Sequence, residues 1–386
     1  MSSNSTIRTM TAQGSTQVKN TEDFRRIVRA LNKLAVKGLL PMFDPAKQLF
    51  CFKLKRTDAG MVQEGISQRY TVITLMGLHR LEQSGTASPI DIQAVFNVLL
   101  ADTAWVDNIG DFGLLLWLSA LVAPDRLNEV DAKFDVKTAL ARFRDSRQGR
   151  TMEMSWFLAG LSHQAIACPE KAAGTKELAS EVYRRVRKNQ GAQGFFGHLA
   201  SNEGIAGVMR SDIGSFADQV YPIYGMAKYS QAYGDDRAAK LALDCALNVC
   251  EAQGSLGQWW WHYDSSNGQV AERFPVFAVH QHAMGPMALY ALGEAIQSDF
   301  SPWIYKGLQW IDDNELGVDM QDDAVNVVWR CIERTRLRRG LNAVMNLATR
   351  REDRETREGL RVLYECRPYE LGWLLYAFAN FEDERS

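Results

Sequence analysis

Two stretches of the chain repeat one pattern: Gln190-Gly-Ala-Gln-Gly194-Phe-Phe196, and Gln253-Gly-Ser-Leu-Gly257-Gln-Trp259, which begins 63 residues later. Both read Q-G-x-x-G-x-aromatic, and both follow a helical pattern. A fainter echo, Asn314-Glu-Leu-Gly317-Val-Asp319, places its glycine 60 residues after Gly257. Repetition at a fixed period of this size indicates a stack of similar supersecondary units.

The repeating unit is a pair of helices followed by an aromatic loop. Its clearest helix is predicted over Asp236–Ala252, with an apolar stripe through Cys245, an acidic start and Gly254 just beyond its end. A partner helix is predicted over Gln219–Tyr233. Further helices are predicted over residues 91–100, 113–121, 136–144, 176–188, 282–296 and 303–312, and strand patterns only in short pieces such as 49–53. The chain is therefore predicted to be mostly α.

Composition places the chain among soluble globular proteins. It has 386 residues, 46% hydrophobic and 23% charged, and a formal net charge of −2, which favours neither nucleic acid nor an anionic membrane as a partner. Its six cysteines lack C-x-x-C spacing, as expected of free thiols in a reducing compartment. Residues 1–20 are polar and lack the apolar core of a signal peptide, and no apolar run approaches the length of a membrane span. We expect a cytoplasmic protein with a flexible tail over 1–20 and a single domain over 21–386; the oligomeric state is left open.

Helical hairpins of about 60 residues that end in Q-G-x-x-G-x-[F/W] resemble the α/α-toroid proteins, in which an outer ring of helices wraps an inner ring. Gln253, Gly257 and Trp259 match the Q-x3-G-x-W motif of terpenoid cyclases and protein prenyltransferases. The string Tyr221-Pro-Ile-Tyr224, followed by Tyr233-Gly-Asp235 and an aromatic loop, resembles the hairpins of the six-hairpin carbohydrate-active enzymes. The resemblance covers about residues 90–380. It implies an all-α toroid with short irregular or β loops at its pocket end.

The acidic motifs of the isoprenoid enzymes are missing from the sequence. Asp235-Asp236, Asp312-Asp313 and Asp322-Asp323 lack the aspartate two residues earlier that class II cyclases of this resemblance carry, and no Asp-Asp-x-x-Asp string occurs. No Asp-x-Cys pair stands near a histidine, as the prenyltransferase zinc set requires. The length is close to that of single-toroid sugar epimerases and unsaturated-uronyl hydrolases, so the resemblance favours a carbohydrate substrate.

Titratable groups are dense in one predicted loop. Three of the six histidines, His262, His280 and His282, fall within 21 residues, together with Asp264 and Glu272. Histidine and carboxylate side chains are the usual proton carriers near neutral pH. We therefore predict that these five residues converge with Asp218 on one pocket as catalytic groups, although packing of the histidines and helix capping by Asp218 remain open. His280 and His282 on an extended segment could also bind a metal with Asp264, but no metal or cofactor is predicted.

Aromatic and basic side chains supply the predicted substrate contacts. Flat rings suit the apolar face of a pyranose or a carbocation, although packing in the core is the alternative for the tryptophan run. A basic side chain such as Arg69 suits a substrate carboxylate. The predicted substrate-binding residues are Trp259, Trp260, Trp261, Tyr263, Arg69, Tyr221, His198 and Arg210.

Three functions remain open at this point. The first is an enzyme that acts on a sugar or uronic acid by acid–base chemistry, as a hydrolase, lyase or epimerase. The second is an isoprenoid cyclase or transferase, and the third is a non-catalytic binding scaffold. A pocket lined by Asp, Glu, Arg and His beside one or two Trp would favour a sugar, whereas an almost wholly apolar aromatic pocket would favour a terpenoid.

Overall fold

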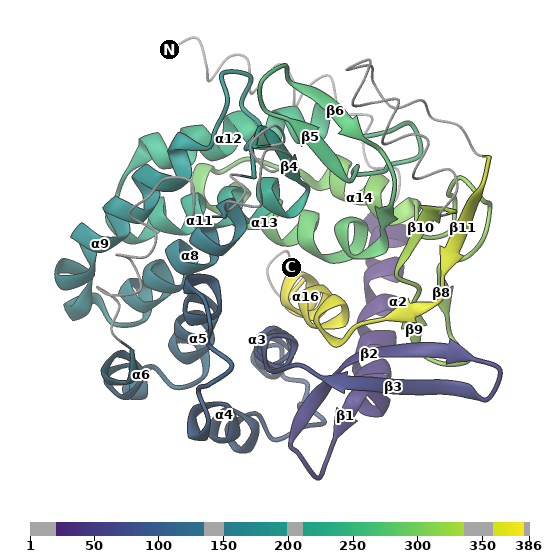
Figure 1. Ribbon diagram of the computed structural model, residues 1–386, viewed down its shortest axis with the longest axis horizontal. Helices are drawn as coiled ribbons and strands as arrows, with labels where there is room; N and C mark the ends of the chain where they lie inside the picture. The colour runs from purple at the N-terminus through teal and green to yellow at the C-terminus, as the bar shows by residue number, and fades with distance from the viewer. Residues whose placement is uncertain (1–20, 135–149, 199–210, 336–357, 382–386) are drawn as a thin grey trace.

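Helices dominate the computed structural model, which describes residues 21–134, 150–198, 211–335 and 358–381. Along these segments the helices alternate between an outer and an inner position (Figure 1). The outer helices are α2 (Thr21–Leu39), α4 (Ile92–Ala101), α6 (Leu127–Lys133), α9 (Pro169–Lys188), α12 (Asp236–Glu251) and α14 (Ser301–Gln309). The inner helices are α3 (Gln68–Gln83), α5 (Ile109–Val122), α8 (Thr151–Ala167), α11 (Ala217–Tyr233), α13 (Gly285–Ile296) and α16 (Pro368–Phe378). The predicted mostly α class is confirmed.

The inner helices pack against one another in chain order. Contacts join α3 to α5, α5 to α8, α8 to α11, α11 to α13 and α13 to α16, and α16 in turn contacts α3. The last helix also packs on the first, because Phe24 of α2 contacts the rings of Phe378 and Phe381. In Figure 1 the inner helices surround the centre of the molecule.

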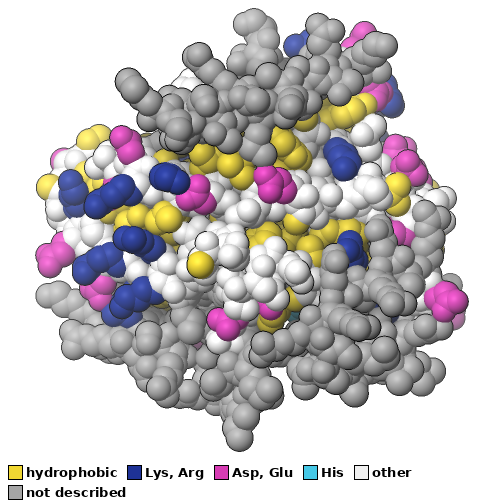
Figure 2. All heavy atoms as spheres, turned by 90° about the horizontal axis from the view of Figure 1, so that it is seen from above, with side chains coloured by type: hydrophobic (Ala, Val, Ile, Leu, Met, Phe, Trp, Pro, Cys, Tyr) yellow, Lys and Arg dark blue, Asp and Glu magenta, His cyan; other side chains and the backbone are white. Residues whose placement is uncertain are grey.

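The inner helices are much more buried than the outer helices. Twelve of the 14 residues of the inner helix α5 are buried, whereas only four of the 20 residues of the outer helix α9 are. A helix that is covered on all sides is apolar all round, and an outer one is amphipathic. In Figure 2, basic side chains gather on the left, where Figure 1 has α9, whose last turn carries Arg185, Arg187 and Lys188.

Two glycines explain how closely α5 and α8 approach. A Cβ on Gly113 would lie 2.4 Å from the backbone N of Phe157, and a Cβ on Gly160 would lie 2.3 Å from the carbonyl O of Gly113. Neither position has room for any side chain, so the two inner helices pack backbone against backbone.

The repeated Gln-Gly loops occupy equivalent places after α9 and α12, as predicted. Gln190 Nε2 donates to Gly194 O at 2.9 Å and to Leu241 O of the next outer helix at 3.1 Å. Gln253 Nε2 donates to Gly257 O and to Trp303 O, both at 3.0 Å. Gly194 and Gly257 have φ values of +87° and +96°, which glycine adopts at little cost. Each glutamine therefore fastens its own loop to the following hairpin.

Every described strand lies in a connection from an outer helix to the next inner helix. The first group precedes α3: β1 (Phe43–Asp44), β2 (Leu49–Thr57) and β3 (Gly60–Ile66), with β12 (Glu365–Cys366) paired to β2. The others are β4 (Ile213–Ser215), β5 (His262–Asp264), β6 (Gln269–Glu272), β7 (Val276–Phe277), β8 (Gln321–Asp322), β9 (Val327–Val328), β10 (Cys331–Arg334) and β11 (Leu360–Leu363). These strands shape the end of the molecule at which the inner helices begin.

Most predicted helices appear within a few residues of their expected bounds. The largest difference is at the start of α9, which begins at Pro169 and not at residue 176. At α13, a π-helical turn, His280–Met284, labelled η3, takes the place of the first residues of the predicted helix over 282–296. The predicted helix over 136–144 lies outside the described residues. All six cysteines are free, and five of them are buried. Among the described helices, none is long and apolar enough to cross a membrane.

Candidate functional site

One polar side chain stands near the start of each inner helix. We call this set the polar ring; its members are Arg69 on α3, Asp111 on α5, Glu153 on α8, Asp218 on α11, His280 on the turn that leads into α13, and Glu370 on α16. Helix N-termini carry a partial positive charge that stabilises carboxylates, and four of the six members are acids. Within the ring, Arg69 of α3 and Asp111 of α5 are in direct contact.

Arg69 and Asp111 form its first contact. Nε and Nη2 of Arg69 donate to the two carboxylate oxygens of Asp111 at 2.5 and 2.8 Å, and Asn108 Nδ2 donates to Oδ2 at 2.7 Å. The Asp111 side chain is 1% exposed and that of Arg69 is 37% exposed. Burial raises the pKa of Asp111, and Arg69 opposes that rise. The arginine is thus oriented by a buried carboxylate and still reaches solvent.

Glu153 lies beside this pair because α5 and α8 approach closely here too. A Cβ built on Gly110 would lie 2.9 Å from Cα of Glu153. The Glu153 side chain is 13% exposed, and its ion pair with Arg150 is long, at 3.5 Å. Burial raises the pKa of Glu153, Arg150 and Arg69 lower it, and Asp111 raises it further. A mostly buried carboxyl with a raised pKa is suited to hold and deliver a proton.

Asp218 links the next two inner helices. Its Oδ1 accepts a hydrogen bond from the backbone N of Met152 at 3.2 Å, and its Oδ2 accepts from the N and Oγ of Ser215 at 2.9 and 2.8 Å. The same Oδ2 lies 2.9 Å from His198 Nδ1. This hydrogen bond raises the pKa of His198, against the effect of burial. Asp218 therefore holds backbone at the start of both helices and orients His198, whose charge also acts on Glu153.

Aromatic side chains lie one helical turn beyond the polar ring. Trp156 and Tyr221 meet edge to face with ring centroids 5.1 Å apart, and Trp373 Nε1 donates to the Tyr221 hydroxyl at 3.0 Å. Each of these three residues follows a ring member by three positions, so it points along the same helix face. They form an aromatic floor. Tyr221, predicted to bind substrate, is 3% exposed and belongs to this floor.

The His-rich segment is split by the structure. His262 Nδ1 shares a short hydrogen bond with Glu272, as expected for neighbouring strands β5 and β6. His280 stacks against Trp261 at 6.3 Å and packs on Phe216 at 4.4 Å, and burial lowers its pKa to about 3. His262, Glu272, Trp261 and His280 therefore lie in one neighbourhood, with His280 neutral near pH 7.

Other predicted site residues lie elsewhere. The Asp264 carboxylate accepts hydrogen bonds from Ser266 and Asn267 of its own turn, so it stabilises the hairpin between β5 and β6. His282 is fully buried in the π-helical turn, and neither ring nitrogen has a hydrogen-bond partner within the part of the chain that the structure describes. The extended H-x-H arrangement is therefore absent, and no group of three metal-binding side chains occurs among the described residues.

The tryptophan run is mainly core, which corrects the prediction that it binds substrate. Trp259 and Trp260 are 0% and 1% exposed, and Tyr263 is 0% exposed with its hydroxyl bonded to the backbone N of Trp260. Only Trp261 is partly exposed. Consecutive bulky rings alternate in direction, and the hairpin covers both sides. Arg210 lies outside the described residues.

The prediction missed Asp111 and Glu153 because each is an isolated acid in the first turn of an apolar helix, where capping is the usual role. The repeat does carry a signal. Gln219 accepts a hydrogen bond from the backbone N of Phe196, and Gln281 accepts one from that of Trp259. Asp218 and His280, which precede these glutamines, are therefore equivalent positions, and aligning the hairpins on them points to the first turns of the inner helices.

The arrangement of inner and outer helices is similar to that of solved carbohydrate-active enzymes. No family model and no curated protein sequence matches the chain. Among solved structures, it resembles a heparin-specific unsaturated glucuronyl hydrolase, with 14% identity over 93% of this chain and 98% of that one and a TM-score of 0.59. It also resembles the unsaturated glucuronyl hydrolase of Bacillus sp. GL1, with 13% identity over 94% and 97% and a TM-score of 0.58.

A third neighbour is an Asp-to-Asn variant of the Streptococcus agalactiae unsaturated glucuronyl hydrolase in complex with dGlcA-GalNAc6S, with 10% identity over 96% and 98% and a TM-score of 0.57. The resemblance to six-hairpin carbohydrate-active enzymes is thereby confirmed at the level of the fold.

Proposed function

We propose that this chain is an α/α-toroid enzyme that acts on a uronic-acid-containing saccharide by general acid–base chemistry in the polar ring. The proposal rests chiefly on the group of Asp111 and Glu153, a buried and a mostly buried carboxyl on adjacent helices, beside Arg69. A sugar-binding site is expected to be lined by acidic, basic and histidine side chains beside a tryptophan, as here beside Trp156. An isoprenoid site would be apolar and aromatic with a lone acid.

The two carboxyls have different surroundings, and this difference assigns their roles. Asp111 receives two hydrogen bonds from Arg69, which favour its ionised form. Among the described residues, the one ion pair of Glu153 is its long contact with Arg150, so its protonated form is the easier of the two to maintain. Glu153 then donates a proton to the substrate and Asp111 accepts one from water, which is the division of labour that glycoside cleavage requires.

A negatively charged substrate suits the side chains around these acids. Arg69 and Arg150 are 37% and 42% exposed, and both act electrostatically on Glu153, so both can bind a carboxylate near it. Trp156 is 4% exposed and lies one helical turn beyond Glu153, in the aromatic floor beneath these acids. The structural neighbours named as unsaturated glucuronyl hydrolases support a uronic acid as the sugar, and their low identity leaves the linkage open.

The test is turnover on a panel of unsaturated and saturated uronyl disaccharides, with prenyl diphosphates as the rival substrates. Loss of ultraviolet absorbance reports removal of the unsaturated uronyl group. We expect activity on a uronyl disaccharide and a fall of at least about a hundredfold in Glu153→Gln, because positioned proton transfer typically contributes roughly 10²- to 10⁴-fold. Glu181→Gln, an exposed acid on α9, is the control. Turnover of a prenyl diphosphate, or full activity of Glu153→Gln on the sugar, would overturn the proposal.

A further inference from the structure

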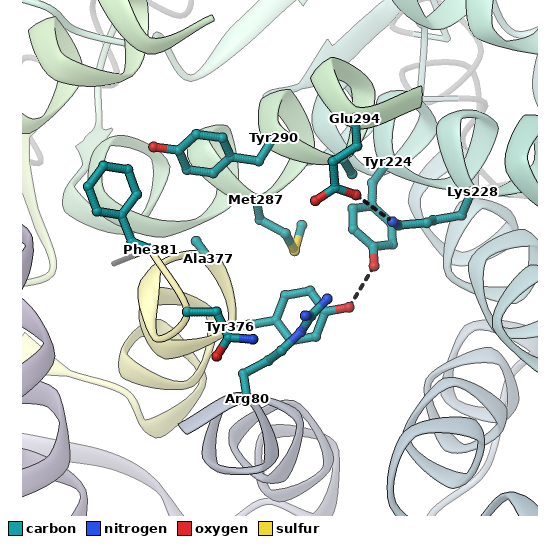
Figure 3. Close-up of a pocket in the computed structure, with 11 residues that line it drawn as sticks. Arg80, Tyr224, Lys228, Met287, Tyr290, Glu294, Tyr376, Ala377 and Phe381 are labelled. Atoms are coloured by element: carbon teal, nitrogen blue, oxygen red, sulfur yellow. Dashed lines mark hydrogen bonds and ion pairs between the residues drawn. The ribbon is translucent and has the colours of Figure 1, made fainter. Parts of the chain in front are cut away.

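A pocket lies between the inner helices, toward the ends opposite the polar ring. It is lined by residues of α3, α11, α13 and α16 and of the segment after α16, and the side chains that matter are Arg80, Lys228, Glu294, Tyr224 and Tyr376 (Figure 3). Arg80 follows Arg69 by 11 residues on α3, which corresponds to about 16 Å along a helix. The aromatic floor lies between the two ends, so this pocket is separate from the polar ring.

Positive charge exceeds negative charge in this pocket. Lys228 Nζ lies 3.1 Å from Glu294 Oε2, and this pair is internally balanced. Arg80 has no salt bridge within the described ranges, and its buried Nε has no hydrogen-bond partner there. Its guanidinium lies 5.0 Å from the centroid of the Tyr376 ring. A buried polar atom without a partner is costly, so the Arg80 Nε beside a cavity is a place where a ligand oxygen can bind.

Hydroxyl groups hold the wall of the pocket rigid. The Tyr224 and Tyr376 hydroxyls lie 2.7 Å apart, Trp117 Nε1 donates to Tyr376 at 3.2 Å, and His163 Nε2 lies 2.7 Å from the Tyr224 hydroxyl. Burial lowers the pKa of His163, so the imidazole is neutral and the network carries no charge. The cations of the pocket therefore face a preorganised neutral wall.

Cavity volume sets the size of the ligand. The cavity measures about 50 Å³, and one water molecule needs roughly 10–15 Å³ on this measure. We infer that this pocket binds one small oxyanion, of the size of phosphate, sulfate or a single carboxylate group, between Arg80 and Lys228. The helix C-termini oppose an anion, and the net positive charge that Arg80 leaves in the pocket offsets that effect.

Inorganic phosphate is the probe. Phosphate also stabilises proteins generally by exclusion from their surface, an effect that grows steadily with concentration. Binding to a site saturates instead. At constant ionic strength we expect a saturable rise in melting temperature with phosphate, and a single binding event by calorimetry. Arg80→Gln should lose the saturable part, whereas Arg237→Gln, whose side chain is 83% exposed, should keep it.

A variant that ends at Phe381 separates two sources of the oxyanion, since the sequence beyond it reads Glu-Asp-Glu-Arg-Ser. Equal phosphate affinity in the full and shortened chains supports a free anion, and tighter binding in the shortened chain supports a carboxylate from this tail. Absence of saturable binding in both chains, or an unchanged isotherm in a folded Arg80→Gln, would overturn the inference. If Arg80→Gln fails to fold, Arg80→Lys should weaken binding at least about tenfold, because it loses the guanidinium fork.

Discussion

His198 Nδ1 lies 2.9 Å from Asp218 Oδ2, and the same carboxylate group is bonded to backbone at the start of two inner helices. His198 is therefore a pH-sensitive group attached to the framework of the polar ring. The carboxylate of Asp218, predicted as a catalytic residue, accepts hydrogen bonds from the backbone of Met152 and from Ser215.

The stability of the chain should depend on pH through this pair. Asp218 raises the pKa of His198 above the ordinary 6.5, so the pair stabilises the fold fully below that value. The contribution is lost as the pH rises through the folded-state pKa. Urea unfolding of wild type and His198→Asn at about pH 5.5 and about pH 9 measures it. We expect the variant to be less stable than wild type mainly at the lower pH; an equal difference at both pH values would contradict this.

Gly110→Ala should damage both stability and activity. The added Cβ would lie 2.9 Å from both Cα and Cβ of Glu153 and from Cε3 of Trp156, so α5 and α8 must separate. Overpacking of this kind costs about 1–3 kcal/mol in the free energy of unfolding. The matched control is Gly174→Ala on α9, where a Cβ meets nothing within 4 Å and a gain of up to about 1 kcal/mol is expected. Chemical unfolding and the disaccharide assay report the two effects.

Asp111→Asn and Asp264→Asn should differ sharply in turnover. Asp111 is buried against Arg69, and removal of its charge should lower kcat by at least about a hundredfold. Asp264 only holds its own turn, and an asparagine preserves most turn hydrogen bonds, so turnover should stay within about threefold of wild type. A comparable loss of turnover in both variants would contradict this and indicate that the catalytic centre lies in the His-rich hairpin.

Gln190→Ala and Gln253→Ala should destabilise the fold to a similar extent. Each glutamine fastens its loop to the next hairpin with two hydrogen bonds, and each bond contributes about 0.5–1.5 kcal/mol. The two sites share no partner, so the losses should add in the double variant. Thermal and urea unfolding measure this, and a large loss in only one variant would show that the repeats are not equivalent.

The repeat could be predicted from the sequence because the residues that form its loop are close together in the chain. A glutamine that closes a loop and a glycine with positive φ must recur together wherever that loop recurs, as they do at Gln190 and Gly194. Helix periodicity then located most inner and outer helices, including Gln219–Tyr233 within α11.

The polar ring could not be predicted in the same way, because each inner helix contributes only one residue to it. Asp111 and Glu153 are 42 positions apart in the chain and come together only through the contact of α5 with α8 at Gly110. Aromatic and titratable residues are instead most closely spaced in Trp259–Asp264. There the large rings fill the core, and Asp264 stabilises a turn. A cluster of titratable side chains in the sequence can reveal a site formed within one hairpin. It does not reveal a site to which several parallel helices each contribute one residue.

Phe24 touches Phe378 and Phe381, so the two ends of the described helical stack meet in the same core. The junction between α16 and α2 resembles any other junction between neighbouring hairpins, except that no peptide bond crosses it. The arrangement of the helices around the centre therefore does not depend on where in this ring the chain begins and ends. A circularly permuted chain, with its old ends tethered and new ends opened in an exposed connection, should assemble the same walls around the same centre.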